Sequence, residues 1–310
     1  MVLVAGSANL DFVVRAPHIP APGETVLGGA FQTFAGGKGA NQALACARAG
    51  GMATHMLLAL GEDAFAAPIE ASLRGAGVTL HAVRPIGVPT GTAFICVDAH
   101  GENAITVAPG ANACLHAEHL PPLQGFSHLL MQLEIPLVTV AAYAHAAKAA
   151  DVRVVLNAAP AQALGQELLA AVDLLVVNEG ELRALSGGGS VADCLARLPC
   201  PAVVVTLGAR GCVAREGDLF HAQTSFHVPV VDTTGAGDTF CGTLVAALAG
   251  QHSMGHALRQ ASAAAALACT QMGAQSSVPH AADVVAFLIQ ATRTDEAAAL
   301  QALRQFAGLP

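Results

Sequence analysis

The residues best suited to chemistry lie in one short turn, DTTGAGD, at positions 232–238. A β-branched run at 227–231 precedes it and predicts a buried strand, and an apolar run at helical spacing begins at Thr239. The order of strand, glycine turn and helix directs backbone N–H groups and the positive end of a helix dipole at one point. Three small residues leave the backbone there open to a charged group: Gly235, Ala236 and Gly237. The turn therefore predicts an anion site.

The carboxylate of Asp238 stands at the mouth of this predicted site, where it would repel a bound anion. Its position makes sense if it takes a proton from an attacking hydroxyl group. The N–H groups would then stabilise the charge that develops on a transferred phosphoryl group. The alternative is a tight turn in which Asp238 is an ordinary helix N-cap. The pattern favours phosphoryl transfer.

A second set of candidate residues follows the ends of predicted strands. On its own, each has a simple structural explanation, because strand ends meet water and Asn and Asp stabilise turns. Together they would converge on one edge of a sheet, which favours a cleft for a polyhydroxylated ligand. The set comprises Asn9, Asp11, Lys38, Asn41, Glu134, Asn157, Asn178, Glu181 and the stretch Thr206-Leu207-Gly208.

The elements that must position these residues follow an alternating order. From residue 127 onward, near-continuous apolar strands alternate with helices, several of them Ala-rich. This order predicts an α/β fold, a doubly wound and mostly parallel sheet with helices on both faces. Two β patches, 12–35 and about 90–108, predict a small β-sheet outside the main layer. The length of 310 residues fits a single domain, 1–310, with this sheet as an appendage.

Composition argues against several classes of protein. The net charge is −8 without a basic cluster, Trp is absent and Tyr143 is the only tyrosine. Nucleic acid and anionic membranes are therefore poor candidates for partners. No uninterrupted apolar run reaches the length of about eighteen residues that predicts a membrane span. The eight cysteines are scattered without a CxxC pair and no signal peptide is evident, so we expect reduced thiols and a cytoplasmic location.

Other nucleotide and metal signatures fail. Gly37-Lys38 lacks the following Ser or Thr and the upstream glycine of a P-loop. No GxGxxG follows the first strand, which argues against a dinucleotide-dependent dehydrogenase. His116 and His119 lie near Cys114, but their spacing fits no standard zinc site. The predicted anion site therefore does not belong to any of these classes.

Two long motifs carry a resemblance to a known family. AGGKGANQALACARAG (35–50) and VDTTGAGDTFCGTLVAAL (231–248) resemble the two signatures of the ribokinase-like carbohydrate kinases, the PfkB family. GSANLD, LLMQLE, NEGE, TLGARG and GAQSSVP also resemble landmarks of the family, so the resemblance spans nearly the whole chain. It implies the ribokinase-like α/β fold, in which the small β-sheet forms a lid over the sugar.

The resemblance also implies roles for residues of this chain. Asp238 would be the catalytic base, with an anion hole of Gly235, Ala236 and Gly237. The implied sugar-binding residues are Asn9, Asp11, Gly37, Lys38, Asn41, Glu134 and Asp238. The implied nucleotide-binding residues are Asn178 and Glu181, tied to phosphate and Mg²⁺, together with Thr206, Gly208, Gly211 and Gly237. A monovalent cation, usually K⁺ in this family, is implied at Asp232, Thr234, Ala268, Gln271, Gly273 and Ser277.

As a function, the resemblance implies ATP-dependent phosphorylation of the terminal 5-hydroxyl of D-ribose to ribose 5-phosphate, by a homodimer that associates through the lid. Other acceptors stay open: 2-deoxyribose, another small sugar, or a nucleoside whose base could use Phe12, Phe31 or Phe34. The preferred nucleotide base is open as well. A non-catalytic sugar-binding regulator is the alternative from a different class, and the intact turn with Asp238 argues against it.

Overall fold

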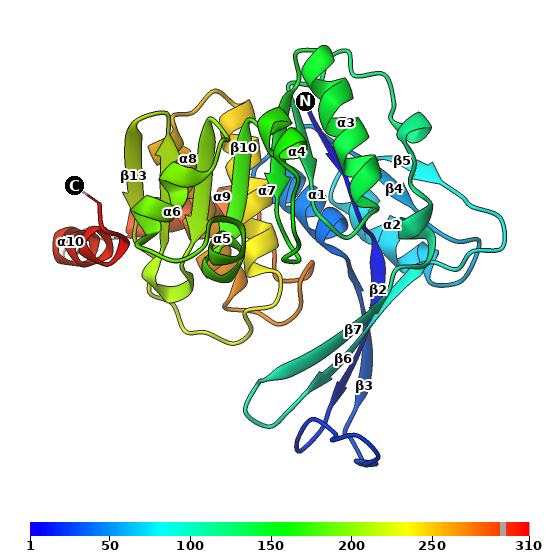
Figure 1. Cartoon of the computed structure of the whole chain (residues 1–310). Coiled ribbons are helices and arrows are strands. Elements are labelled where there is room, and N and C mark those ends of the chain that lie inside the picture. Colours follow the sequence, from blue (N-terminus) through cyan, green and yellow to red (C-terminus); the bar gives the residue numbers. More distant parts are fainter. Residues whose placement is uncertain (292–295, 310) are drawn as a thin grey trace.

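The computed structural model describes residues 1–291 and 296–309 and contains a large and a small β-sheet (Figure 1). The strand order of the large sheet is β13-β12-β11-β10-β9-β8-β1-β4-β5. Its strands are β1 (Val2–Ala5), β4 (Thr54–Ala59), β5 (Thr79–Val83), β8 (His128–Met131), β9 (Arg153–Asn157), β10 (Leu174–Asn178), β11 (Ala202–Thr206), β12 (Cys212–Glu216) and β13 (Leu219–Gln223). The strands from β5 to β11 pair in parallel, and β12 and β13 add an antiparallel edge.

Helices cover both faces of the large sheet, because its strands are apolar on both faces. In β1, Leu3 packs into one hydrophobic cluster while Val2 and Val4 pack into the other. One face carries α1 (Lys38–Arg48), α2 (Ala66–Gly75), α7 (Ala236–Ala249), α8 (Met254–Ala268) and α9 (Ala281–Gln290). The other carries α3 (Leu137–Ala149), α4 (Gln166–Ala171), α5 (Glu179–Ser186), α6 (Val191–Arg197) and α10 (Glu296–Ala307). The predicted doubly wound, mostly parallel sheet is thereby confirmed.

The small sheet extends from the main body at the lower right of Figure 1. Its order is β3-β2-β6-β7, with β2 (Asn9–Arg15), β3 (Phe31–Gly36), β6 (Gly91–Val97) and β7 (Asn103–Ala108). Three residues, 6–8, separate β1 in the middle of the large sheet from β2. The base of the small sheet therefore lies at the carboxyl end of β1. Between β2 and β3, residues 16–30 contain no strand and most of them are exposed.

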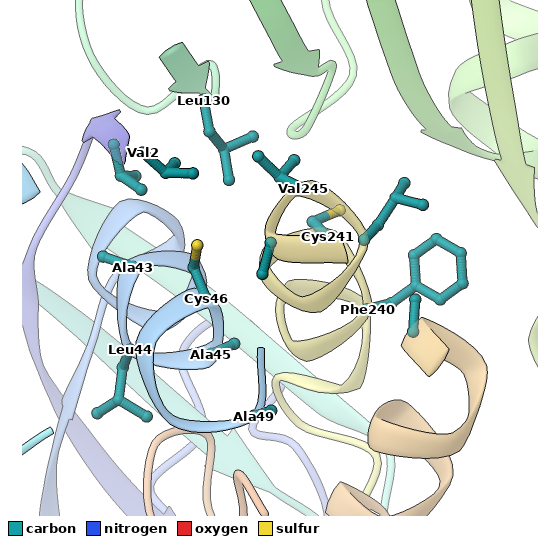
Figure 2. Packing of buried hydrophobic residues seen from close by; sticks show 14 of the residues in the cluster. Val2, Ala43, Leu44, Ala45, Cys46, Ala49, Leu130, Phe240, Cys241 and Val245 are labelled. Carbon is teal, nitrogen blue, oxygen red and sulfur yellow. The ribbon is translucent and has the colours of Figure 1, made fainter. Parts of the chain in front are cut away.

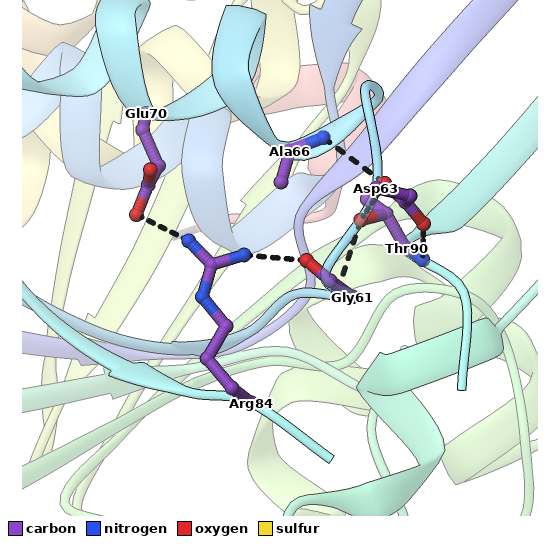
Figure 3. Close-up of polar contacts among 6 residues, drawn as sticks. All are labelled: Gly61, Asp63, Ala66, Glu70, Arg84 and Thr90. Carbon is purple, nitrogen blue, oxygen red and sulfur yellow. Dashed lines mark hydrogen bonds and ion pairs between the residues drawn. The ribbon is translucent and has the colours of Figure 1, made fainter. Parts of the chain in front are cut away.

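A polar cluster anchors the start of β6 to the main body (Figure 3). Asp63 accepts bonds from the N–H of Thr90 at 2.7 Å and from its hydroxyl group at 2.8 Å. The same hydroxyl group accepts the N–H of Gly61 at 2.9 Å, and Arg84 links the Gly61 carbonyl to Glu70. Since Thr90 directly precedes β6, these bonds fix the point from which the strand leaves the main body.

Helices α1 and α7 pack unusually close together through small residues (Figure 2). A Cβ atom added at Gly242 would overlap the Gln42 carbonyl and lie 2.8 Å from the Ala45 Cβ, well inside contact distance. On the sheet side, Val245 packs in the same cluster as Val2. The absence of a side chain at 242 therefore brings the first turns of the two helices together. Short 3-10 helices complete the fold at Gly110–Cys114, Ala117–His119 and Gly208–Arg210.

Two predictions can be compared directly with these elements. The predicted strand at 227–231 is wrong: this segment forms no strand, and its valines 230 and 231 are 65% and 60% exposed. Its backbone instead reaches the end of α8, where the N–H of Val231 donates to the Cys269 carbonyl at 2.8 Å. Val228 and Val230 line a cavity, and the segment pairs with no strand. No helix in the described ranges is long and apolar enough to cross a membrane.

Candidate active site

Two cavities meet at the N-terminus of α7. The first, of about 350 Å³, lies against the small sheet and is lined by Gly235 and Asp238; the second, of about 440 Å³, is lined by Ala236 and Gly237. Thr233 lines both. Other lining residues are Asn9, Asp11, Gly37, Lys38, Asn41 and Glu134 in the first cavity, and Thr206, Gly208 and Gly211 in the second. One turn of backbone thus separates two spaces large enough for small-molecule ligands.

The turn itself is built for a close approach to the backbone. Gly235, the N-cap of α7, has φ 74°, and an added Cβ would lie 2.9 Å from the Cα of Ala274, so only glycine fits. At Gly237 an added Cβ would meet nothing within 4 Å. The N–H groups of a first helical turn have no acceptor within the helix. Open space and the positive end of the helix dipole coincide at Gly237, although the N–H of Ala236 already donates to the Thr233 carbonyl at 3.2 Å. This geometry is compatible with an anion site, which stays a prediction.

Two side-chain amides hold Asp238, which lies in the first turn of α7. Asn41 donates from Nδ2 to one carboxylate oxygen at 2.9 Å, and Gln42 donates from Nε2 to the other at 2.8 Å. Both amides come from the N-terminal half of α1, so the close packing of α1 and α7 brings them to Asp238. Asp238 is therefore not the N-cap of the helix: it is a fixed acceptor that faces the first cavity.

The strand β2 supplies two polar residues to the first cavity. Asn9 accepts a hydrogen bond from Asn112 at 2.7 Å, and the side chain of Asn112 is itself bonded to the backbone of Ala8. Asn112 therefore fixes the orientation of the Asn9 amide. The pKa of Asp11 is raised to about 7, chiefly by burial of the carboxyl group. The negative charges of Glu134 and Asp238 contribute to this rise, and the charge of Lys38 opposes it. Asp11 therefore changes its charge near neutral pH.

Glu134 and Lys38 complete the wall of the first cavity. The Glu134 carboxylate follows β8 and accepts the Ser7 hydroxyl at 2.6 Å and the Lys38 N–H at 3.1 Å. Burial acts to lower the pKa of Lys38, but the surrounding carboxylates, Asp238 first, outweigh it and hold that pKa above its ordinary value. A charged ammonium group in the wall of the first cavity thus interacts with the surrounding acids.

The structure places Asn178 and Glu181 differently from the other candidates. They form a capping box at the start of α5, with bonds of 2.8 Å in both directions, and line neither cavity. Glu181 is buried, and burial raises its pKa, as does the charge of Asp238. The bond from the Asn178 N–H and the charge of Lys38 act in the opposite direction. The charge of Glu181 therefore interacts with those of Asp238 and Lys38, although Glu181 lines neither cavity.

Asp232 ties the turn to the loop that follows α8. Its carboxylate accepts the N–H and hydroxyl of Thr234 at 2.9 and 2.7 Å, and the N–H of Gly273 at 2.9 Å. These bonds outweigh burial and hold the pKa of Asp232 below its usual range. Of the implied cation ligands, these three line the first cavity, whereas Ala268, Gln271 and Ser277 do not. Within residues 1–291 and 296–309, no cluster of three His, Cys, Asp or Glu side chains could hold a metal.

Comparison with known proteins decides the family. The model of the "pfkB family carbohydrate kinase" matches residues 1–281. The chain belongs to the pfkB family of carbohydrate kinases. It is 38% identical to a ribokinase of Haemophilus influenzae over 92% of this chain and 97% of that protein. Two solved structures share the fold: a Thermotoga maritima ribokinase with a TM-score of 0.86 and 36% identity, and an Arabidopsis thaliana ribokinase complexed with ribose and ATP, with a TM-score of 0.85 and 34% identity. Each covers at least 93% of this chain and is itself covered to 99%.

Sequence reasoning on this pfkB-family kinase missed three residues of the site. Gln42 bonds Asp238, and Asn112 orients Asn9. Thr233 lines both cavities. Gln42 and Thr233 lie inside the quoted motifs GGKGANQ and DTTGAGD, so a closer reading of the motifs could have found them. Asn112 lies outside any motif, in a 3-10 helix that the sequence did not indicate, and only the fold brings it to Asn9.

Proposed function

We propose that this pfkB-family kinase phosphorylates the terminal 5-hydroxyl of D-ribose with ATP, giving ribose 5-phosphate and ADP. The observation that supports this most is the pair of cavities on either side of residues 235–238, with Asp238 facing the polar one. The first cavity supplies carboxylates and amides that suit sugar hydroxyl groups. The second is lined largely by small and apolar residues, which suits a nucleotide base and ribose.

The proposed reaction is an in-line transfer across the turn. The sugar hydroxyl oxygen bonds to the γ-phosphorus of ATP while the bond between that phosphorus and the bridging β-phosphate oxygen breaks, and Asp238 takes the hydroxyl proton. In this proposal, the N–H groups at the start of α7 stabilise the negative charge that develops on the phosphoryl oxygens. Positioning and charge stabilisation of this kind are the main demands of phosphoryl transfer.

The relatives support ribose as the acceptor. A ribokinase of Haemophilus influenzae and one of Bacillus subtilis are 38% and 37% identical to this chain, and the Arabidopsis ribokinase structure is a complex with ribose and ATP. We would incubate the purified protein with Mg-ATP and K⁺, offer D-ribose, 2-deoxyribose, fructose and adenosine separately, and measure ADP release. Faster ADP release with another acceptor would change the assigned substrate and keep the mechanism. No ADP release with these acceptors or with a wider panel of sugars would favour a non-catalytic sugar-binding regulator.

The pKa of Asp11 predicts how sugar binding depends on pH. A carboxylate accepts a sugar hydroxyl, so binding needs the ionised form, and burial raises this pKa to about 7. As the pH falls from about 8 to about 6, the ionised fraction falls about tenfold and the KM for sugar should rise about tenfold. Steady-state kinetics at fixed ATP measure this. Asp11→Asn should bind sugar weakly with a flat pH profile, and a wild-type KM that stays constant would contradict the prediction.

Two cations complete the proposal. Mg²⁺ is held in many kinases by one or two carboxylates and by phosphate oxygens, and it keeps several of its waters. Glu181 is the carboxylate that we propose for it; because Glu181 lines neither cavity, it would act through such a water molecule. For K⁺, the ionised Asp232 and the oxygen-rich loops with Thr234, Ala268, Gln271, Gly273 and Ser277 supply the oxygen donors that such a hard cation prefers. When bound, the cations would add positive charge close to the anion site.

The K⁺ proposal has a direct test in Asp232→Asn. Exchange of K⁺ for Na⁺ should lower wild-type turnover about tenfold, which corresponds to about 1.4 kcal/mol of lost charge stabilisation. K⁺ should also raise the wild-type melting temperature, since a ligand of the native state stabilises it. In Asp232→Asn both differences between the ions should vanish. A wild-type rate that is the same in both salts would remove K⁺ from the proposal.

We propose further that the small sheet is a lid and a dimer contact. Phe31 and Phe94 are 59% and 55% exposed and stack on Phe12 with ring centroids 5.8 and 5.3 Å apart. An exposed aromatic patch of this kind is typical of an association surface. A monomeric mass by light scattering at assay concentration would remove the dimer. A cytoplasmic location is also part of the proposal, supported by eight cysteines that are all free thiols.

A further inference from the structure

Gln42 is a fully buried amide whose hydrogen-bonding atoms all have partners. It lies in α1, directly after Asn41, with no exposed surface. Its Nε2 donates to Asp238 at 2.8 Å and to Asn157 at 2.9 Å, so both amide hydrogens are used. Its Oε1 accepts a bond from Gln132 Nε2 at 2.7 Å. Gln42 lines neither cavity, so it cannot touch sugar or nucleotide.

A backbone atom sets the direction of this network. Asn157 donates from Nδ2 to the Val176 carbonyl at 3.1 Å, and a carbonyl oxygen can only accept. The Oδ1 of Asn157 must therefore face Gln42, and Gln42 must present its NH₂ group to Asn157 and to Asp238. The amide of Gln42 has only one orientation that satisfies all of its partners, so a hydrogen-bond donor always faces the Oδ1 of Asp238.

We propose that Gln42 is the positioning residue of Asp238, and that Asn157 acts on Asp238 through Gln42. The inference rests on the proposed function, in which Asp238 takes the proton of the sugar hydroxyl. Gln42 and Asn41 each donate a hydrogen bond to one carboxylate oxygen of Asp238, and together they prevent rotation of the carboxylate about its bond to Cβ. A base that is displaced by about 1 Å can lose about a hundredfold in rate.

The decisive variant is Gln42→Met, which keeps the length of the side chain but removes the amide. We expect kcat to fall about 10- to 100-fold while the KM values for sugar and ATP stay within about twofold of wild type, because the residues that line both cavities are untouched. Gln223→Met is the matched control: it removes a buried amide that donates to the Thr224 carbonyl, whereas the side-chain amides that hold Asp238 are those of Asn41 and Gln42. It should leave kcat near the wild-type value.

A double-mutant cycle separates positioning from general stability. Asn157→Ala should lower kcat by itself, and the double variant with Gln42→Met should be no slower than Gln42→Met alone, since the path to Asp238 is already cut. A purely structural role predicts losses that add and KM values that change. If Gln42→Met does not fold, Asn157→Ala still decides: unchanged kcat would overturn the proposal.

The inference and the proposed function fail in different ways. If Asp238→Asn is nearly inactive while Gln42→Met keeps kcat within about twofold of wild type, the positioning role is wrong and the base stands. If both variants turn over normally, the assignment of Asp238 as base is wrong, and the inference falls with it. A low kcat with unchanged KM values in Gln42→Met and a near-inactive Asp238→Asn is the result that we expect.

Discussion

Replacement of Asp238 by Asn should lower kcat about 10²- to 10⁴-fold, the usual contribution of a general base. Asn has the same size and keeps an oxygen that can accept one of the amide bonds from Asn41 and Gln42, but it cannot take up the hydroxyl proton. Sugar binding depends on several other groups in the first cavity, so its KM should change little. Steady-state kinetics with ribose and ATP measure both quantities.

The matched control for this variant is Asp283→Asn. Asp283 also lies in the first turn of a helix, α9, where it caps the His280 N–H, and it lines neither cavity. Turnover of this control should stay at the wild-type level, and its melting temperature shows what the loss of a first-turn carboxylate does to stability alone. Near-normal turnover in Asp238→Asn would refute the assignment of the base.

Gly242→Val should be the most damaging substitution outside the cavities. In an exposed helix, replacement of Gly by a larger residue stabilises slightly, because Gly is a poor helix former. Here the new side chain would overlap the Gln42 carbonyl and crowd Ala45, so α1 must move. Overpacking of this kind should cost about 3 kcal/mol of the free energy of unfolding. Turnover should fall at least about tenfold, since the amides that hold Asp238 travel with α1.

Gly75→Val provides the contrast. Gly75 is the last residue of α2, is exposed, and an added Cβ would meet nothing within 4 Å. Its substitution should change the free energy of unfolding by less than about 0.5 kcal/mol, as at most surface positions. Urea unfolding followed by circular dichroism measures both variants. Equal stability of the two would show that α1 and α7 tolerate a wider spacing than the structure indicates.

The parts of the site that could be predicted from the sequence are local in the chain. In DTTGAGD, the glycines, the helix start and the carboxylate are adjacent, so their chemistry follows from order alone, and the structure places Gly235 and Asp238 accordingly. The alternating strands and helices likewise predict the large sheet, because both periodicities are visible within each segment. The roles that we assign to individual residues remain predictions until the variants are measured.

What could not be predicted depends on contacts between distant segments. The bond between Gln42 and Asp238 spans 196 positions and exists because Gly242 lets α1 and α7 approach. At 227–231, β-branched residues favour a strand, but tertiary context prevails, because the Val231 N–H bonds the Cys269 carbonyl after α8 while Val228 and Val230 line the second cavity. Periodicity reports which face of a segment is apolar, and it does not report what covers that face.

The segment 16–30, at the far end of the small sheet, has a consequence for how this kinase can diverge. It connects β2 to β3, is largely exposed and lines neither cavity, whereas the opposite end of the same strands carries Asn9 and Asp11. Insertions and deletions in such a connection change few contacts. Lineages can therefore lengthen, shorten or recharge this tip, and so acquire or lose binding partners, while the chemistry at the base of the sheet is inherited unchanged.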